Sequence, residues 1–361
     1  MTAWVKGRPA QPDAAVAAAA DLLGRAHTPL VAGLCADAAA LRAAYRLARD
    51  LGATVDPAAG PGLYADLAAL AAAGAMTTTP AEAAGRADLL LVVGHGPWDD
   101  PVLAGLAAGA PSRGRAGGAA RAAGSARTVL ALGGTPGGAV RTVSYPARDG
   151  LPAALGLLRG LVAGRIAGEH ALADLAARLR AALYAVVAYD PAELGSLATE
   201  MLTGLVKDLD TTTRAFALPL GHAGQDRAVA QVAAWTTGQG PRVGFGRGRA
   251  EHDPWRFDAA RQIASGEVDA ALWLAALPAP RPDWTRAVPT VALLGEAVGD
   301  EAEVVIRVAV PGRERGGALW HPGRAAIAWH PATAASDAPE AASVLAGLHT
   351  RLAPTERPAP C

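Results

Sequence analysis

Residues 203–241 read TGLVKDLDTTTRAFALPLGHAGQDRAVAQVAAWTTGQGP, and residues 266–275 read GEVDAALWLA. The first stretch predicts a helix, a strand over residues 214–220, the glycine-bounded loop 221–224 and a second helix over residues 225–236. The second stretch predicts another buried strand, because its apolar run is short and continuous. Strands that alternate with helices in this way are typical of an open, mostly parallel sheet.

The rest of the chain continues this alternation and predicts an α/β fold of two Rossmann-like units, each a mostly parallel sheet with helices on both faces. We expect residues 1–150 to form the first unit, residues 151–335 the second, and residues 336–361 a closing helix and a disordered, proline-rich tail. The segments 110–126 and 238–254 are rich in glycine and arginine and predict loops. Further strands are predicted at residues 29–34, 53–56, 88–94, 127–132, 140–145, 184–189, 290–294 and 303–308, and further helices at 37–51, 63–73, 151–163, 171–183, 191–209, 255–265 and 335–352.

The composition excludes several classes of function. The 361 residues include 33 Lys and Arg and 33 Asp and Glu, so the net charge is zero and no nucleic-acid partner is expected. No apolar run reaches the length of a membrane span, and the N-terminus lacks a signal-peptide pattern, so we expect a cytoplasmic protein without a membrane partner. The two cysteines, Cys35 and Cys361, are expected to be reduced.

Loops that follow predicted strands are the candidate sites, because ligands of open α/β sheets bind beyond the carboxyl ends of the strands. These loops are residues 94–100, 221–224 and 276–282, and the first two contain His95 and His222. Each histidine could be a general base or a satisfied loop residue, and each loop could bind an anion or be an ordinary turn. Neither histidine has a neighbour at metal-ligand spacing. The pair Asp99-Asp100 could bind Mg²⁺ or begin the next helix, and the second interpretation is favoured.

Four segments, in this order, make the chain resemble the B subunit of formylmethanofuran dehydrogenases, a branch of the molybdopterin oxidoreductases. They are HTPLVAGLCADAAALRAAYRLARDLGATVD at 27–56, GRADLLLVVGHGP at 85–97, ASGEVDAALWLA at 264–275 and EAEVVIRVAVPG at 301–312. The resemblance implies the fold described above. It also implies a redox site built on a molybdenum or tungsten pterin and an iron–sulfur cluster.

The chain departs from that family at both metal sites. The family holds its cluster through a cysteine-rich N-terminal segment, and this chain has two cysteines in total. The family's metal-bound cysteine or selenocysteine corresponds to the loop 56–62, DPAAGPG, which has no sulfur and no imidazole. Cys35 does not match that position. We therefore expect no pterin, molybdenum, tungsten or cluster, and the vestigial cleft loops keep only Gly94, His95, Gly96, Gly221 and His222.

A B subunit without metal sites resembles the corresponding chain in the formyltransferase/hydrolase complexes of methylotrophic bacteria. The resemblance implies a complex that moves a formyl group from a tetrahydromethanopterin carrier to a methanofuran-type carrier and releases formate. It implies three partners, namely an amidohydrolase-like subunit, a formyltransferase and a further structural subunit. The leading hypothesis is a non-catalytic scaffold. The alternatives are a formylmethanofuran dehydrogenase with unusual metal ligation, and a small-molecule-binding module that uses the old cofactor cleft near His95 and His222.

Overall fold

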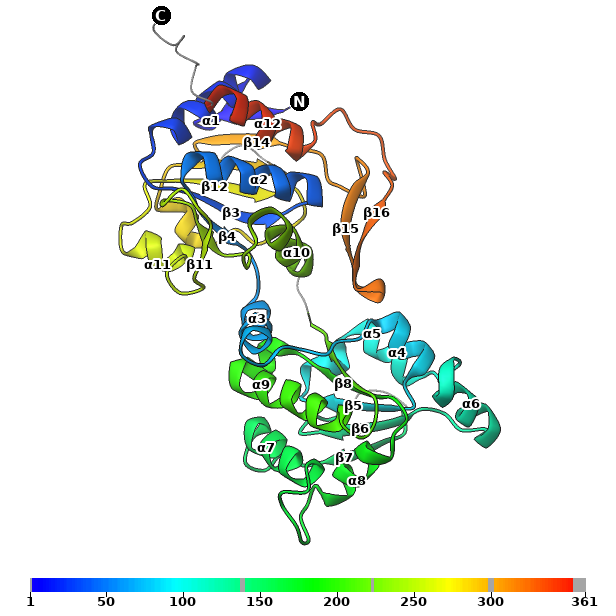
Figure 1. The fold of residues 1–361 in the computed structure, drawn as a ribbon. Coiled ribbons are helices and arrows are strands. Elements are labelled where there is room, and N and C mark those ends of the chain that lie inside the picture. Colours follow the sequence, from blue (N-terminus) through cyan, green and yellow to red (C-terminus); the bar gives the residue numbers. More distant parts are fainter. Residues whose placement is uncertain (1, 137–139, 222–223, 298–301, 353–361) are drawn as a thin grey trace, which may run out of the picture. The chain divides into compact units, whose positions relative to one another are not determined.

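The computed structural model describes residues 2–136, 140–221, 224–297 and 302–352, and it contains two compact units (Figure 1). This division differs from the predicted boundary at residue 150. The reason is strand pairing, because an early strand joins a late one in each sheet. Unit 1 comprises Met1–Ala59, Gly224–Trp320 and Ala326–Cys361, and unit 2 comprises Gly60–Ala223 and His321–Ala325.

Unit 1 contains a nine-stranded mixed sheet in the order β11-β10-β4-β3-β12-β13-β14-β1-β2. Its five central strands, from β4 to β14, are parallel, and the outer strands on both sides are antiparallel. The parallel strands have a doubly wound order, since β4 and β12 lie on opposite sides of β3. The strands are β1 Ala3–Val5, β2 Arg8–Ala10, β3 Pro29–Cys35, β4 Thr54–Pro57, β10 Val243–Gly244, β11 Glu251–His252, β12 Ala270–Ala275, β13 Thr290–Leu294 and β14 Val304–Arg307.

Helices cover both faces of this sheet. Along β3, Val31 packs in the core beneath α1, α2, α10 and α12, whereas Leu30 and Ala32 face the opposite core with α11. This period of two is what a strand buried on both faces requires. The helices are α1 Pro12–Arg25, α2 Ala38–Leu51, α10 Asp226–Thr237, α11 Ala259–Ala264 and α12 Ala341–Leu352, with the short 3-10 turn η2 Asp283–Arg286.

Unit 2 contains a five-stranded, fully parallel sheet in the order β7-β6-β5-β8-β9. All five residues of β5 are buried, with Leu91 in the core beneath α7, α8 and α9, and Leu90 in the core beneath α4 and α5. The strands are β5 Leu89–Val93, β6 Thr128–Leu132, β7 Thr142–Tyr145, β8 Ala185–Tyr189 and β9 Ala215–Pro219. The helices are α3 Pro61–Ala73, α4 Pro80–Arg86, α5 Pro101–Ala107, α6 Gly114–Ala123, α7 Leu151–Val162, α8 Ala173–Ala181 and α9 Pro191–Asp210, with the 3-10 turn η1 Gly96–Asp99.

The structure confirms the α/β fold class and most of the predicted strands, but it corrects the segment 110–126. That segment contains helix α6, which buries Ala116 and Gly117 and ends at Gly124 in the left-handed conformation. The segment 238–254, also predicted as a loop, contains the short strands β10 and β11, which extend the sheet beyond β4. The pattern also missed β1, β2 and α4, and it gave no bounds for α5. It missed as well the two-stranded sheet of β15 Gly317–His321 and β16 Ala326–His330 with its 3-10 turn η3 Pro322–Arg324. None of the helices in the described ranges combines the length and hydropathy that a membrane span needs.

Candidate functional site: the strand-end loops of unit 2

The candidate site lies at the carboxyl ends of β5, β8 and β9. In the order β7-β6-β5-β8-β9, the chain leaves β5 toward one edge of the sheet and later returns to β8 on its other side. The crevice beside such a reversal is where doubly wound sheets bind ligands. At this position the sheet carries Gly94, His95 and Gly96 after β5, Asp190 after β8 and Gly221 after β9. The structure therefore brings together four of the five predicted loop residues, and His222 lies outside the described residues.

The backbone amides of the β5 loop are bound by a carboxylate of the chain itself. His95 N–H donates to Glu193 Oε1 at 2.8 Å and to Oε2 at 2.9 Å, and Gly96 N–H donates to Oε2 at 2.7 Å. Glu193 lies in the first turn of α9, and Gly195 interrupts the helix just after it, with φ of 67°. The amides that could bind the anion of a ligand are thus already hydrogen-bonded to the Glu193 carboxylate of the same chain.

The glycines of these loops make room for two carboxylates. A Cβ on Gly94 would lie 2.5 Å from Glu193 Oε2, and a Cβ on Gly96 would lie 2.7 Å from Asp190 Oδ2. A Cβ on Gly221 would lie 2.8 Å from the Asp190 carboxyl group. A Cβ at any of these positions would therefore push a carboxylate out of its place. Gly94 and Gly221 also have φ of 86° and 72°, a conformation that favours glycine whatever the space around it.

The acidic groups at this edge also hold the loops together. Asp190 accepts a hydrogen bond from Ala192 N–H at 2.8 Å and begins α9, while Asp100 begins α5 by accepting from Val102 N–H at 2.8 Å. Asp100 also accepts from Gly221 N–H at 3.1 Å. The prediction that the Asp99-Asp100 pair begins the next helix is confirmed for Asp100. Burial raises the pKa of Asp190, and the neighbouring carboxylates raise it further. Negative charge at this edge opposes the entry of an anionic ligand.

His95 has no arrangement that identifies it as a general base. Its side chain is exposed, and its Nδ1 accepts a long hydrogen bond of 3.4 Å from Thr135 N–H. Among the described residues, no group of three or more His, Cys, Asp or Glu is placed to hold a metal ion. The imidazole therefore joins the β5 and β6 loops, which is the satisfied-loop interpretation of the sequence.

A buried carboxylate outside the predicted site residues lies in the loop 56–62, which the sequence resemblance compared with the metal loop of the dehydrogenases. Asp56, in β4, accepts from Arg242 Nε at 2.8 Å and from Ala259 N–H at 2.7 Å. Arg242 also forms an ion pair with Asp258 at 3.0 Å, and Asp258 begins α11. Burial raises the pKa of Asp56 to about 6, although Arg242 opposes this shift. The one indication of this buried ion pair in the sequence was an acidic residue at the end of a predicted buried strand.

The thiol of Cys35 does not suit a soft metal either. Cys35 ends β3, and burial together with the nearby Asp226 raises the pKa of its thiol to about 11. A raised thiol pKa makes it less favourable to form the thiolate that a soft metal binds. With Asp56 held by Arg242, Cys35 is the one sulfur ligand that the described residues offer near the carboxyl ends of β3 and β4, which is a poor donor set for a molybdenum or tungsten centre.

Replacing Glu193 with alanine should destabilise unit 2 by about 1–2 kcal/mol, because two backbone amides lose a charged acceptor. Hydrogen exchange should accelerate at the amides of His95 and Gly96, and urea unfolding should report the loss of stability. Glu193→Gln should lose less, since its amide oxygen still accepts. Glu200→Ala is the matched control, because Glu200 is an exposed glutamate of the same helix. Equal effects of the Glu193 and Glu200 substitutions would contradict the assigned role.

Comparisons with known proteins agree with this architecture, although no family model matches the chain. The chain is 56% identical over 357 residues to the B subunit of the formyltransferase/hydrolase complex Fhc of Methylorubrum extorquens, an alignment that covers 98% of this chain and 97% of the relative. It also matches a chain in the X-ray crystal structure of the FhcABCD complex of that organism with methylofuran. That match has a TM-score of 0.91 and 56% identity, and it covers 97% of this chain and 98% of the other. The chain therefore belongs to the family of formyltransferase/hydrolase complex B subunits.

Proposed function

We propose that this chain is a non-catalytic scaffold of a formyltransferase/hydrolase complex. Its partners are an amidohydrolase-like subunit, a formyltransferase and a further structural subunit. The complex moves a formyl group from a tetrahydromethanopterin carrier to a methanofuran-type carrier and releases formate. Family membership supports the complex, and the relative's complex was crystallised with methylofuran.

The observation that carries the scaffold role is the internal carboxylate in the strand-end loops. Glu193 occupies the amides of His95 and Gly96, and Asp190 fills the space beside Gly96 and Gly221. A cofactor phosphate or carboxylate at this position would have to displace a charged group that already makes short hydrogen bonds. The loops are thus more suited to holding the fold than to holding a cofactor.

The scaffold role also fits the donor atoms around Asp56. An ion pair that is largely buried is costly to break, and this one ties β4 to α11 through Arg242 and Ala259. The position that would supply a metal ligand in the redox relatives is thus used to hold two elements of unit 1 together. We accordingly propose that the chain holds no molybdenum or tungsten pterin and no iron–sulfur cluster.

The proposal predicts that the assembled complex tolerates the loss of the candidate imidazole. His95→Ala should leave kcat for formate release within about twofold of the wild type, since a general base contributes a hundredfold or more. Elemental analysis of the same preparation should find molybdenum, tungsten and iron far below one atom per chain. A hundredfold fall in kcat would overturn the non-catalytic assignment. Stoichiometric molybdenum or tungsten would instead favour a dehydrogenase with unusual ligation.

A further inference from the structure

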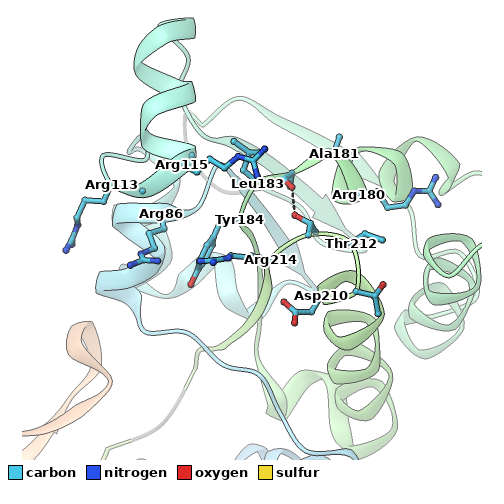
Figure 2. A pocket seen from close by; sticks show the side chains of 15 residues that line it. Arg86, Arg113, Arg115, Arg180, Ala181, Leu183, Tyr184, Asp210, Thr212 and Arg214 are labelled. Carbon is cyan, nitrogen blue, oxygen red and sulfur yellow. Dashed lines mark hydrogen bonds between the residues drawn. The ribbon is translucent and has the colours of Figure 1, made fainter.

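Unit 2 has a basic depression at the end of its sheet opposite to the acidic loops. It has a volume of about 720 Å³ and lies where β8 and β9 begin (Figure 2). Five arginines line it, and we call them the arginine surface. The arginine surface consists of Arg86, Arg113, Arg115, Arg180 and Arg214. In Figure 2, Arg86 and Arg214 lie beside Tyr184, and Arg113 and Arg180 lie on opposite sides of the view.

These arginines come from separate elements that the fold brings together. Arg86 ends α4, Arg113 and Arg115 flank the start of α6, Arg180 lies in the last turn of α8, and Arg214 directly precedes β9. All five residues are exposed. The N-terminus of α6, which has no side-chain cap, adds its positive dipole end to the same depression. Sequence reasoning predicted a loop here and missed the cluster.

The positive charge of the arginine surface is mostly uncompensated. Among the described residues that line the depression, Asp210 is the one acidic residue, and Glu82 forms an ion pair with Arg86 at 3.4 Å. Within the described ranges, the other four arginines form no ion pair with a carboxylate. Arginines elsewhere in unit 2 do so, for example Arg159 with Asp208 at 2.8 Å. Since the whole chain has a net charge of zero, this concentration of positive charge is local.

We propose that the arginine surface binds an acidic segment of another protein of the complex, an inference that rests on the proposed scaffold function. Several exposed guanidinium groups spread around an open depression match several carboxylates along a peptide. A small anion would require donors that converge in a desolvated pocket. Among the described residues, the side chains that line this depression include no buried polar atom that lacks a hydrogen-bond partner, so no donor is reserved for a small anion.

The test compares assembly of the full complex with two doubly substituted chains. In Arg115→Gln/Arg214→Gln the arginine surface loses two charges, whereas Arg141→Gln/Arg148→Gln removes two exposed arginines of unit 2 outside it. We expect the first variant to weaken assembly about tenfold at low salt and the control to leave it unchanged. Charge reversal to Glu should weaken assembly further. The dissociation constant of the wild type should rise with salt concentration more steeply than that of the first variant.

Three outcomes separate this inference from the proposed function. If the wild-type chain assembles and the Arg115/Arg214 variant assembles equally well, the arginine surface is not a docking site, although the scaffold role stands. If the wild-type chain does not join the other subunits, the scaffold role itself fails. If inorganic pyrophosphate binds to wild-type chain and not to the variant while assembly is unchanged, the surface is a small-anion site and the proposal is overturned. Circular dichroism confirms that each variant is folded.

Discussion

Replacing Arg242 with methionine is expected to lower the free energy of unfolding by about 3–5 kcal/mol at about pH 8. The Arg242 side chain is 13% exposed and that of Asp56 is 8% exposed, so the substitution leaves a carboxylate in a place with little water. Arg242 also pairs with Asp258 at the start of α11, and this contact is lost as well. The cost should therefore be far larger than for an ion pair on the surface.

The loss should depend on pH in a defined direction. The pKa of Asp56 is raised to about 6 in the folded chain, and without Arg242 it should rise further. An acid with a raised folded-state pKa contributes stability that is fully present below its unfolded pKa and is lost as the pH rises through its folded pKa. The deficit of the variant should consequently shrink between about pH 8 and about pH 5, because Asp56 becomes protonated in both proteins.

Urea unfolding at several pH values measures this prediction. Arg249→Met is the control, since the Arg249 side chain is 76% exposed and pairs with Glu251 at the surface, where such pairs contribute little. The double variant Asp56→Asn/Arg242→Met should recover part of the loss and should show no deficit that grows with pH. A deficit in Arg242→Met that is constant with pH would mean that packing, and not the buried charge, accounts for the loss.

The sequence predicted the strands far better than it predicted their grouping. The run DLLLVVG predicted a buried strand, and the structure places it as β5 in the centre of its sheet. The boundary at residue 150 failed because β5 pairs with β8 and β3 pairs with β12, and the pairing of distant strands is not encoded in local periodicity. The helix α6 was missed because its glycines lower helix propensity, whereas burial of Ala116 and Gly117 favours the helix.

The candidate site shows the same limit in its chemistry. The loop positions Gly94, His95 and Gly96 could be found from the strand that precedes them. The sequence could not show that Glu193, far along the chain, would bind their amides. This contact depends on β8 lying next to β5 and on the interruption of α9 at Gly195. Sequence patterns thus located the site, and tertiary structure determined what fills it. The same reasoning applies to the arginine surface, whose members come from separate segments of the chain.

Replacing Arg127 with methionine should destabilise unit 2 by about 3–5 kcal/mol, because a buried guanidinium binds the ends of two helices. Arg127 is 6% exposed and directly precedes β6. It donates to Ala87 O at 2.8 Å, to Ala84 O at 2.8 Å and to Ala83 O at 3.3 Å, and it also donates to Leu106 O. These carbonyls lie at the ends of α4 and α5, where a helix leaves its last carbonyl groups unpaired.

Charge and geometry can be separated by a second substitution. Burial lowers the pKa of Arg127, and Asp88 opposes this shift. The charged guanidinium is therefore stabilised at this buried position by the carbonyl groups that accept its hydrogen bonds. Arg127→Lys retains the charge, but one compact ammonium group cannot reach carbonyls of both helices. We therefore expect its free energy of unfolding to lie between those of the wild type and Arg127→Met. Equal losses for Lys and Met would show that the fork geometry matters more than the charge.

Hydrogen exchange locates the effect. In Arg127→Met the amides of α4 and α5 should exchange faster than those of α7, which packs on the other face of the sheet. Arg148→Met is the control, because Arg148 is exposed in the same unit. Uniform acceleration across unit 2 would contradict a local role for Arg127. Since Arg86 ends α4, the loosened helix should also hold the arginine surface less firmly, so Arg127→Met should weaken assembly of the complex more at low salt than at high salt.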